Sequence, residues 1–413
     1  MKKFTKLSLV AAVAVAGLTS ANAKPLEEAI KDVDVSGSVV YRYNDYRNDS
    51  LATNKSTTDN NYKIGLNLSS KVNDYVKFNS RFVVGTPDIG PGTQGLFGGA
   101  GFASLPTQTL GDGNPEVRLT NAYFGLTAIP NTTVNVGKMG LATPWTVAID
   151  SDGGEQTGTG VLALSTVGPV TVAAGYFNQT NLDSSGDAIG TLTAIRKPGT
   201  TANIGASDIA TAAVIGNFGI VNVDAWYLNM ADVFDTYTIG AEAKFDLGEN
   251  SKVGLEARYV NLSPENKTVA KDQSLAKLVA TGKFGIINAK VAYATTDKDG
   301  GTTAIDNDSK ATLLGWNLNA NGKADADYYQ LVLGVDILDN LNLSANYGNI
   351  EWKPAANAKR EQEEIYAQLV YKMSKNLNTY VRYGTFTDDI RVGGVKTKNN
   401  DDTRGRLQVE YTF

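Results

Sequence analysis

The chain has 413 residues, of which 42% are apolar, with 42 Gly, only 11 Pro and a formal net charge of −5. No run of 18 apolar residues follows residue 23, which excludes a helical membrane protein, and 19 Tyr, 13 Phe and 4 Trp argue against a disordered chain. The absence of Cys and His excludes disulfides, thiolate metal sites and Ser-His-Asp hydrolases.

Residues 1–23 have the composition of a cleaved signal peptide. Three lysines precede an apolar segment at 7–17, and an Ala-Asn-Ala cleavage signal ends at Ala23. The apolar segment is too short to span a bilayer, which argues against a membrane anchor. We therefore expect export of a mature chain, residues 24–413, that forms a single domain and has a net charge of −8 once the three lysines are removed.

From Val33 onward the dominant pattern is an alternation of apolar and polar residues, which is typical of strands with one face in contact with an apolar phase. At the C-terminus, Leu407, Val409 and Tyr411 alternate with polar residues. The alternation predicts eighteen strands, at 33–46, 60–69, 74–85, 117–128, 132–139, 159–166, 169–178, 208–216, 219–229, 235–246, 251–262, 273–283, 286–296, 327–337, 340–351, 362–373, 377–388 and 402–413. A nineteenth apolar segment, 309–319, is assigned to a loop.

The lengths of the connections decide the architecture. Connections that follow even-numbered strands are tight turns, whereas those that follow odd-numbered strands are mostly long, especially 86–116 and 297–326. Short turns at one rim and long loops at the other are typical of outer-membrane barrels, in which closure leaves no unpaired strand edge in the hydrocarbon. The sequence therefore predicts an all-β fold: a closed, transmembrane, antiparallel β-barrel of about 18 strands.

The start of the mature chain carries a specific resemblance. Residues 25–37, Pro-Leu-Glu-Glu-Ala-Ile-Lys-Asp-Val-Asp-Val-Ser-Gly, followed by Tyr41-Arg42-Tyr43, resemble the Campylobacter-type major outer membrane porin family. Phe413 closes an alternating strand and looks like the signal that outer-membrane proteins present to their assembly machinery. The resemblance implies an eighteen-stranded homotrimer in the bacterial outer membrane that lets small solutes diffuse, with a calcium ion near its constriction.

One loop is expected to fold into the lumen and narrow it. The loop from Gly140 to Gly158 follows the fifth strand and holds Asp150, Asp152 and Glu155, and porins place a constriction loop at this position. We interpret these acids as one side of the constriction, the alternative being a solvated surface loop. They are also hard oxygen ligands at a spacing that suits calcium.

Basic residues are expected on the opposite wall. Alternation places Arg42, Arg81, Arg382, Arg404 and Arg406 on the polar faces of strands that become neighbours when the barrel closes. Lys138 is added to this basic wall on the condition that its strand is irregular near Gly137. The alternative is a general solvation of the lumen, for which Lys would serve as well as Arg.

The combined pattern predicts an outer-membrane porin: a water-filled channel for passive diffusion of ions and small hydrophilic solutes, with a weak cation preference. A surface adhesin anchored by the barrel is the alternative. An outer-membrane enzyme is disfavoured, because the families it would resemble use a catalytic His. The expected partners are two further copies of the chain, outer-membrane lipids and the assembly machinery, with no nucleic acid and no required cofactor.

Overall fold

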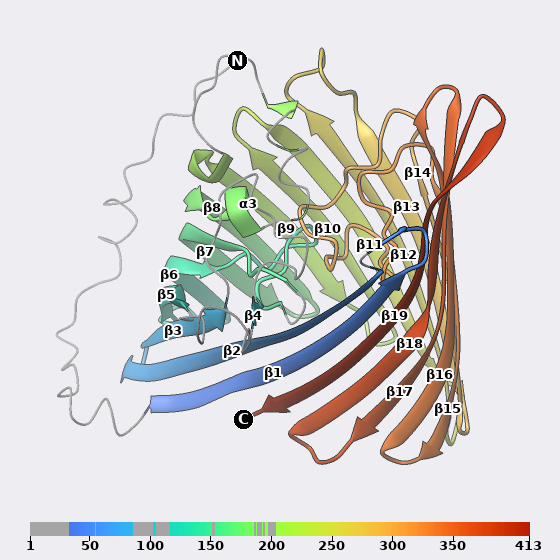
Figure 1. The fold of residues 1–413 in the computed structure, drawn as a ribbon. Coiled ribbons are helices and arrows are strands. Elements are labelled where there is room, and N and C mark those ends of the chain that lie inside the picture. Colours follow the sequence, from blue (N-terminus) through green and yellow to red (C-terminus); the bar gives the residue numbers. More distant parts are fainter. Residues whose placement is uncertain are drawn as a thin grey trace.

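The computed structural model describes residues 33–53, 55–85, 102–104, 116–150, 153–185, 187, 192, 195–196 and 204–413. The expected signal peptide lies outside the described residues. The strands, shown in Figure 1, are β1 (Val33–Asn48), β2 (Ser56–Asn73), β3 (Val76–Gly85), β4 (Ala103–Ser104), β5 (Glu116–Leu126), β6 (Thr132–Gly140), β7 (Thr157–Val167), β8 (Val170–Thr180), β9 (Ile209–Asn217), β10 (Val221–Met230), β11 (Phe234–Asp246), β12 (Ser251–Pro264), β13 (Gln273–Phe284), β14 (Ile287–Thr296), β15 (Asp327–Leu338), β16 (Leu341–Ala355), β17 (Ala358–Lys372), β18 (Leu377–Val392) and β19 (Val395–Thr412). Two short helical segments, α3 (Leu182–Ser185) and η1 (Ile204–Ala206), lie between β8 and β9.

The strands form one closed antiparallel barrel. Each long strand pairs with the next along the chain, and β19 pairs with β1, which closes the ring. Phe413 extends this closure, because its backbone N–H and C=O both bond to Gly37 of β1. The two-residue strand β4 pairs with β2 beyond the end of β3, so the wall of the described barrel consists of eighteen strands. The predicted fold class and every predicted strand are confirmed.

The largest difference from the predicted strands lies in the last hairpin. β18 and β19 continue to Val392 and Val395, where the sequence pattern predicted strand ends at 388 and 402. The two strands meet at Gly393 and Gly394, whose φ angles of 55° and 87° lie in the left-handed region that a two-residue hairpin turn requires. In β19 the alternation is lost over residues 396–402 because these residues are polar on both faces, yet the backbone ladder continues.

The faces of the barrel are inverted relative to a water-soluble protein. On β18, Val381 and Tyr383 point outward and are 47% and 64% exposed, whereas Phe386 and Asp388 point inward and are buried. The same outward placement recurs around the ring in Ile239, Leu331 and Ile365. An apolar outside is stable where the surrounding phase is hydrocarbon.

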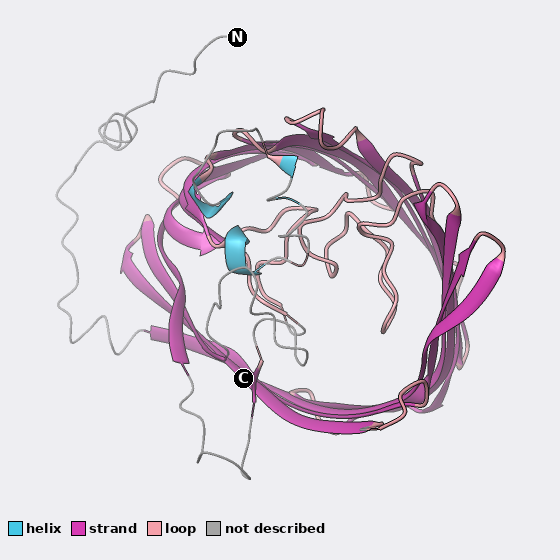
Figure 2. Ribbon diagram, turned by 45° about the horizontal axis from the view of Figure 1, so that its top comes forward, coloured by secondary structure: helices cyan, strands magenta, loops and turns pink. Residues whose placement is uncertain are grey.

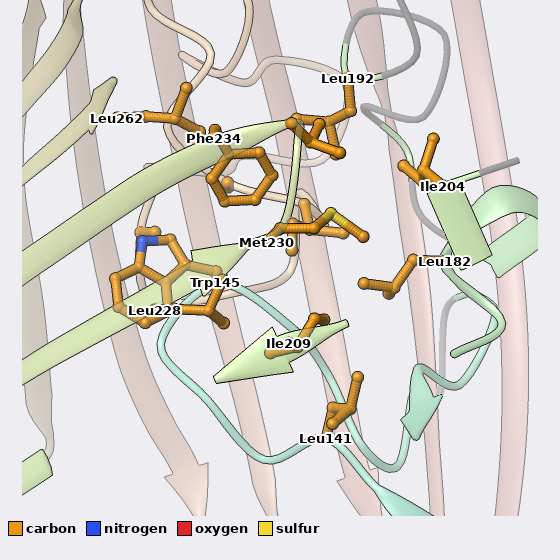
Figure 3. Packing of buried hydrophobic residues seen from close by; sticks show 14 of the residues in the cluster. Leu141, Trp145, Leu182, Leu192, Ile204, Ile209, Leu228, Met230, Phe234 and Leu262 are labelled. Carbon is orange, nitrogen blue, oxygen red and sulfur yellow. The ribbon is translucent and has the colours of Figure 1, made fainter. Parts of the chain in front are cut away.

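The interior of the ring holds folded loops, as Figure 2 shows. Residues 141–150 and 153–156, α3 and the segment 297–326 pack against one another and against β8–β12 around a buried apolar cluster that includes Trp145, Leu182, Phe234 and Ile305. Figure 3 shows the side chains of this cluster converging from loop and strand. Within the described residues, no helix is long and apolar enough to cross a membrane. The inward loops narrow the lumen (Figure 2), and they form a packed structure with its own hydrophobic core.

Candidate pore constriction

Two inward loops, rather than one, make up the constriction. The backbone N–H groups of Ile305 and Asp306 donate to the carbonyl of Trp145 at 3.0 and 3.1 Å, and Ala311 N–H donates to the carbonyl of Pro144 at 2.8 Å. The loop from Gly140 to Gly158 was predicted to enter the lumen, whereas a long connection was predicted for 297–326. The apolar residues Leu313, Leu314 and Trp316 of this segment indicate that it packs inside the barrel, because large apolar side chains are unfavourable in a loop surrounded by water.

The first loop is held to the barrel wall by a buried ion-pair cluster. Arg81 of β3 donates from Nε and Nη2 to both carboxylate oxygens of Glu155, at 2.8 and 2.6 Å, and Lys63 of β2 lies 3.4 Å from the same carboxylate. The side chains of Glu155, Arg81 and Lys63 are only 3%, 4% and 5% exposed. Lys63 Nζ also donates to the loop carbonyls of Asp150 and Gly153. Glu155 therefore anchors the loop.

The remaining acids of the constriction come from both loops. Asp150, Asp306 and Asp308 each place a carboxylate oxygen within 4.8 Å of the others, and the first two are buried. Asp152 lies outside the described residues. Burial, together with the nearby carboxylates of Asp187 and Asp150, raises the pKa of Asp306 to about 8. Burial is the main cause of this shift and the two nearby carboxylates add to it, so a cation bound among these groups would be stabilised.

Three of the predicted wall arginines lie close together on the inner face. Cross-strand pairing sets Arg382 of β18 opposite Arg406 of β19 on the inner face, and Arg404 lies two residues farther along the same face. Each of the three guanidinium groups also lies against aromatic rings: Arg404 is 4.4 Å from the centre of Phe386, and Arg382 is 4.5 Å from that of Tyr380. These three arginines are half-buried and line the lumen.

Arg42 and Arg81 are on the inner face, as predicted, but both are buried. Arg42 donates from Nε and Nη2 to the side-chain oxygen of Gln408, at 2.9 and 2.6 Å, and Phe102 covers its guanidinium at 4.2 Å. The guanidinium group of Arg81 is paired with the carboxylate of Glu155. The alternation of residues along each strand correctly predicted that these arginines are on the inner face of the barrel. It could not show which of them the inward loops cover.

The prediction that Lys138 lines the pore is wrong. Lys138 pairs with Ala122 of β5, on the face that carries the outward Phe124, while Gly137 pairs with Tyr123 on the inner face. Lys138 Nζ donates at 2.8 Å to the carbonyl of Leu119, a residue that is itself 44% exposed on the outside. The backbone at Gly137 is irregular, with φ 131°, but the pairing keeps its alternation through this residue.

A glutamate on the wall holds the second loop, and sequence reasoning did not identify it. The buried carboxylate of Glu364, on β17, accepts from the backbone N–H groups of Trp316 and Asn317 at 3.0 and 2.7 Å, and from the Asn317 amide at 3.1 Å. Arg404 Nη1 donates to Asn317 Oδ1 at 2.5 Å. The ring of Trp316 consequently lies 5.9 Å from both Arg382 and Arg406. The second loop thus reaches the basic wall.

Basic and acidic side chains reach the lumen from different elements of the fold. Arg382, Arg404 and Arg406 lie on one wall, and the carboxylates of Asp150, Asp306 and Asp308 belong to the loops that cross the lumen. In a narrow passage with low-dielectric walls, such fixed charges act strongly on passing ions. The arrangement can orient and select small charged solutes without any covalent step.

Comparison with known proteins agrees with this architecture. OpdL of Pseudomonas aeruginosa superposes with a TM-score of 0.68 at 15% identity, covering 93% of this chain and 99% of OpdL. OccAB3 of Acinetobacter baumannii gives 0.68 at 14% identity, with 92% and 99% covered, and OccK2 of Pseudomonas aeruginosa, solved in complex with glucuronate, gives 0.66 at 14%, with 92% and 98% covered. These likenesses establish the fold. No curated protein sequence matches the chain.

The family assignment comes from a separate comparison. The model of the family described as Campylobacter major outer membrane protein matches residues 1–413, so the resemblance seen in residues 25–43 extends over the whole length. Together with the closed barrel and its inward loops, this match shows that the chain belongs to the Campylobacter major outer membrane protein family.

Proposed function

We propose that this protein is a porin that lets ions and small hydrophilic solutes diffuse passively across the outer membrane. The observation that carries the proposal is a closed barrel of eighteen long strands, apolar outside and charged inside, whose lumen is narrowed by two anchored loops. A barrel of this size leaves an aqueous channel. Family membership and fold support a location in the outer membrane. We propose that the chain reaches this membrane by export and cleavage of residues 1–23, as the sequence of that segment predicts.

We propose a weak preference for cations. Two of the five predicted wall arginines, Arg42 and Arg81, are covered, and Glu155 neutralises the second. The carboxylates of Asp150, Asp306 and Asp308 lie together in the constricting loops, and the mature chain is acidic overall. Arg382 and Arg406 oppose this preference, whereas Arg404 forms an ion pair with Asp402 at 2.5 Å. The preference is therefore modest and increases as salt is lowered.

A calcium ion is proposed at the junction of the two loops. Three carboxylates with ligand atoms within 4.8 Å of one another form a hard oxygen donor set of the kind that Ca²⁺ prefers. The carboxylate of Glu155 is engaged by Arg81 and Lys63, so we transfer its proposed ligand role to Asp306 and Asp308 and retain Asp150. Calcium would link the loops and neutralise their mutual repulsion.

We also propose a homotrimer, assembled through the outer face of β1, β2, β18 and β19. This flank is apolar and includes small side chains such as Gly37 and Thr379, which allow close approach of a second barrel. The terminal Phe413, bonded to Gly37 at the closure of the barrel, is proposed as the recognition residue for the assembly machinery. We infer no catalytic activity, because the chain lacks His and Cys.

Conductance of the purified protein in a planar bilayer tests the proposed function. Stepwise current increases with a reversal potential displaced toward the cation equilibrium under a potassium chloride gradient are expected. An intact, inserted barrel that never conducts would contradict the proposal and favour an adhesin that uses the barrel only as an anchor.

A further inference from the structure

A second charged site lies on the inner wall formed by β11–β17, away from the constriction. A hollow of about 670 Å³ is lined there by Lys244, Lys252, Lys283 and Lys290, together with amide side chains such as Asn346 and Gln368. This volume is within the range of about 300–1,000 Å³ that is usual for sites of small ligands. The hollow opens near the rim of short turns, because Lys252 follows the β11–β12 turn and Lys283 precedes the β13–β14 turn.

The lysines of this hollow are poorly compensated by acids. Lys252 and Lys283 are direct cross-strand partners in the β12–β13 pair, an arrangement of like charges that destabilises a sheet. Asp336 lies 2.7 Å from Lys283, and it also accepts from the amides of Asn288 and Asn342 at 3.0 and 2.8 Å. Both of its oxygens are therefore engaged, and Asp336 compensates one lysine only.

The other three lysines have no carboxylate partner among the described residues. Lys290 Nζ donates to the neutral side chain of Gln330 at 2.9 Å, and no ion pair or hydrogen bond is found for Lys244 or Lys252. Asp246 lies opposite Lys252 on β11 and lines the hollow without forming an ion pair with it. When Asp246 and Asp336 are both counted against the four lysines, two positive charges are left.

A neighbouring hollow on the same wall has a different charge balance. It has a volume of about 280 Å³ and lies against the second inward loop, where Glu242, Glu256 and Asp308 are interspersed with Lys277 and Lys310. Two of its lysines are paired, at 3.0 Å between Lys277 and Glu256 and at 3.1 Å between Lys310 and Glu242, and the third, Lys290, lines both hollows. When Lys290 is counted with the larger hollow, the smaller hollow has three acids and two lysines, so the excess of cations belongs to the larger hollow.

We propose that the larger hollow is a low-affinity binding site for small dianionic solutes carrying carboxylate or phosphate groups. Its two uncompensated positive charges match two negative charges, and lysine side chains bind such groups as mobile point charges. The amide of Gln368 adds a neutral donor for an oxygen atom of the solute. Because the hollow is open to water, binding weakens as salt is raised.

Equilibrium binding to the detergent-solubilised barrel tests the proposal without any need for conduction. Saturation-transfer NMR detects succinate, and the ³¹P linewidth detects inorganic phosphate. The test variant is Lys244→Gln with Lys252→Gln, whose side chains are both exposed in the lumen. The matched control is Lys77→Gln, which removes one exposed lysine near the same rim on the distant strand β3.

The wild-type barrel is expected to bind a dianion in preference to acetate at equal ionic strength, and the double variant about tenfold more weakly, corresponding to about 1.4 kcal/mol. Lys77→Gln should bind as the wild type does. Binding of succinate or of phosphate supports the proposal and identifies the preferred group. Binding of neither, equal competition by acetate, or unchanged binding by the double variant overturns it. If the double variant fails to fold, as judged by circular dichroism, the two single variants provide the same comparison.

Discussion

The ion pairs of Glu155 offer a direct way to test what holds the constriction in place. Glu155→Gln keeps the size of the side chain but leaves the buried cations of Arg81 and Lys63 without their shared anion. Removing one partner of a buried pair costs about 3–5 kcal/mol, because the remaining charge stays desolvated. Since the three side chains are at most 5% exposed, little of this cost is relieved by solvent while the loop stays docked.

The cost falls on docking of the loop rather than on the barrel, whose strands pair independently of Glu155. A loss of about 3 kcal/mol lowers the docking equilibrium constant by about a hundredfold. We therefore expect the variant to show frequent transitions to a higher conductance, and faster amide hydrogen exchange in residues 141–156. The double variant Arg81→Gln with Glu155→Gln should recover part of the loss, because fewer buried charges are left unpaired.

Single-channel recordings and hydrogen exchange of the two variants provide the measurement, with heat-modifiable migration as the control for an intact barrel. If Glu155→Gln has wild-type conductance, wild-type current noise and wild-type exchange in residues 141–156, the ion pairs do not hold the loop and the reasoning is refuted.

Further predictions concern the second loop, selectivity, calcium and assembly. Glu364→Ala should raise conductance by releasing the backbone N–H groups that hold the second loop, and unchanged single-channel currents would argue against that role. Joint neutralisation of Asp150, Asp306 and Asp308, which leaves the anchor Glu155 in place, should shift the reversal potential toward anions under a salt gradient, most strongly at low salt. If the reversal potential does not shift, these acids are not the filter. Calcium should raise the melting temperature of the wild type more than that of Asp306→Asn, measured by circular dichroism, and equal effects would remove the proposed site. Native mass spectrometry should give a trimer, and detection of monomer alone would count against the proposed contact through β1, β2, β18 and β19.

The sequence alone determined the wall of the barrel. Alternation fixes which face of each strand meets the apolar phase, so the inward direction of Arg382 and Arg406 could be predicted without coordinates. The sorting of short and long connections likewise determined the closed topology, because hydrocarbon does not tolerate an open strand edge. Where both faces are polar, as at 396–402, the alternation disappears and the strand ends could not be predicted.

The tertiary structure alone decided the contents of the lumen. Asp150 and Asp306 are far apart along the chain and meet only because two loops pack on a shared apolar core. The same packing buries Arg42 and pairs Glu155 with Arg81. These residues were predicted to be charges exposed in the pore, whereas in the structure they are buried or hold the loop in place. Alternation is a local property of a strand, whereas the position of a loop depends on contacts between distant segments, and no local pattern encodes these contacts.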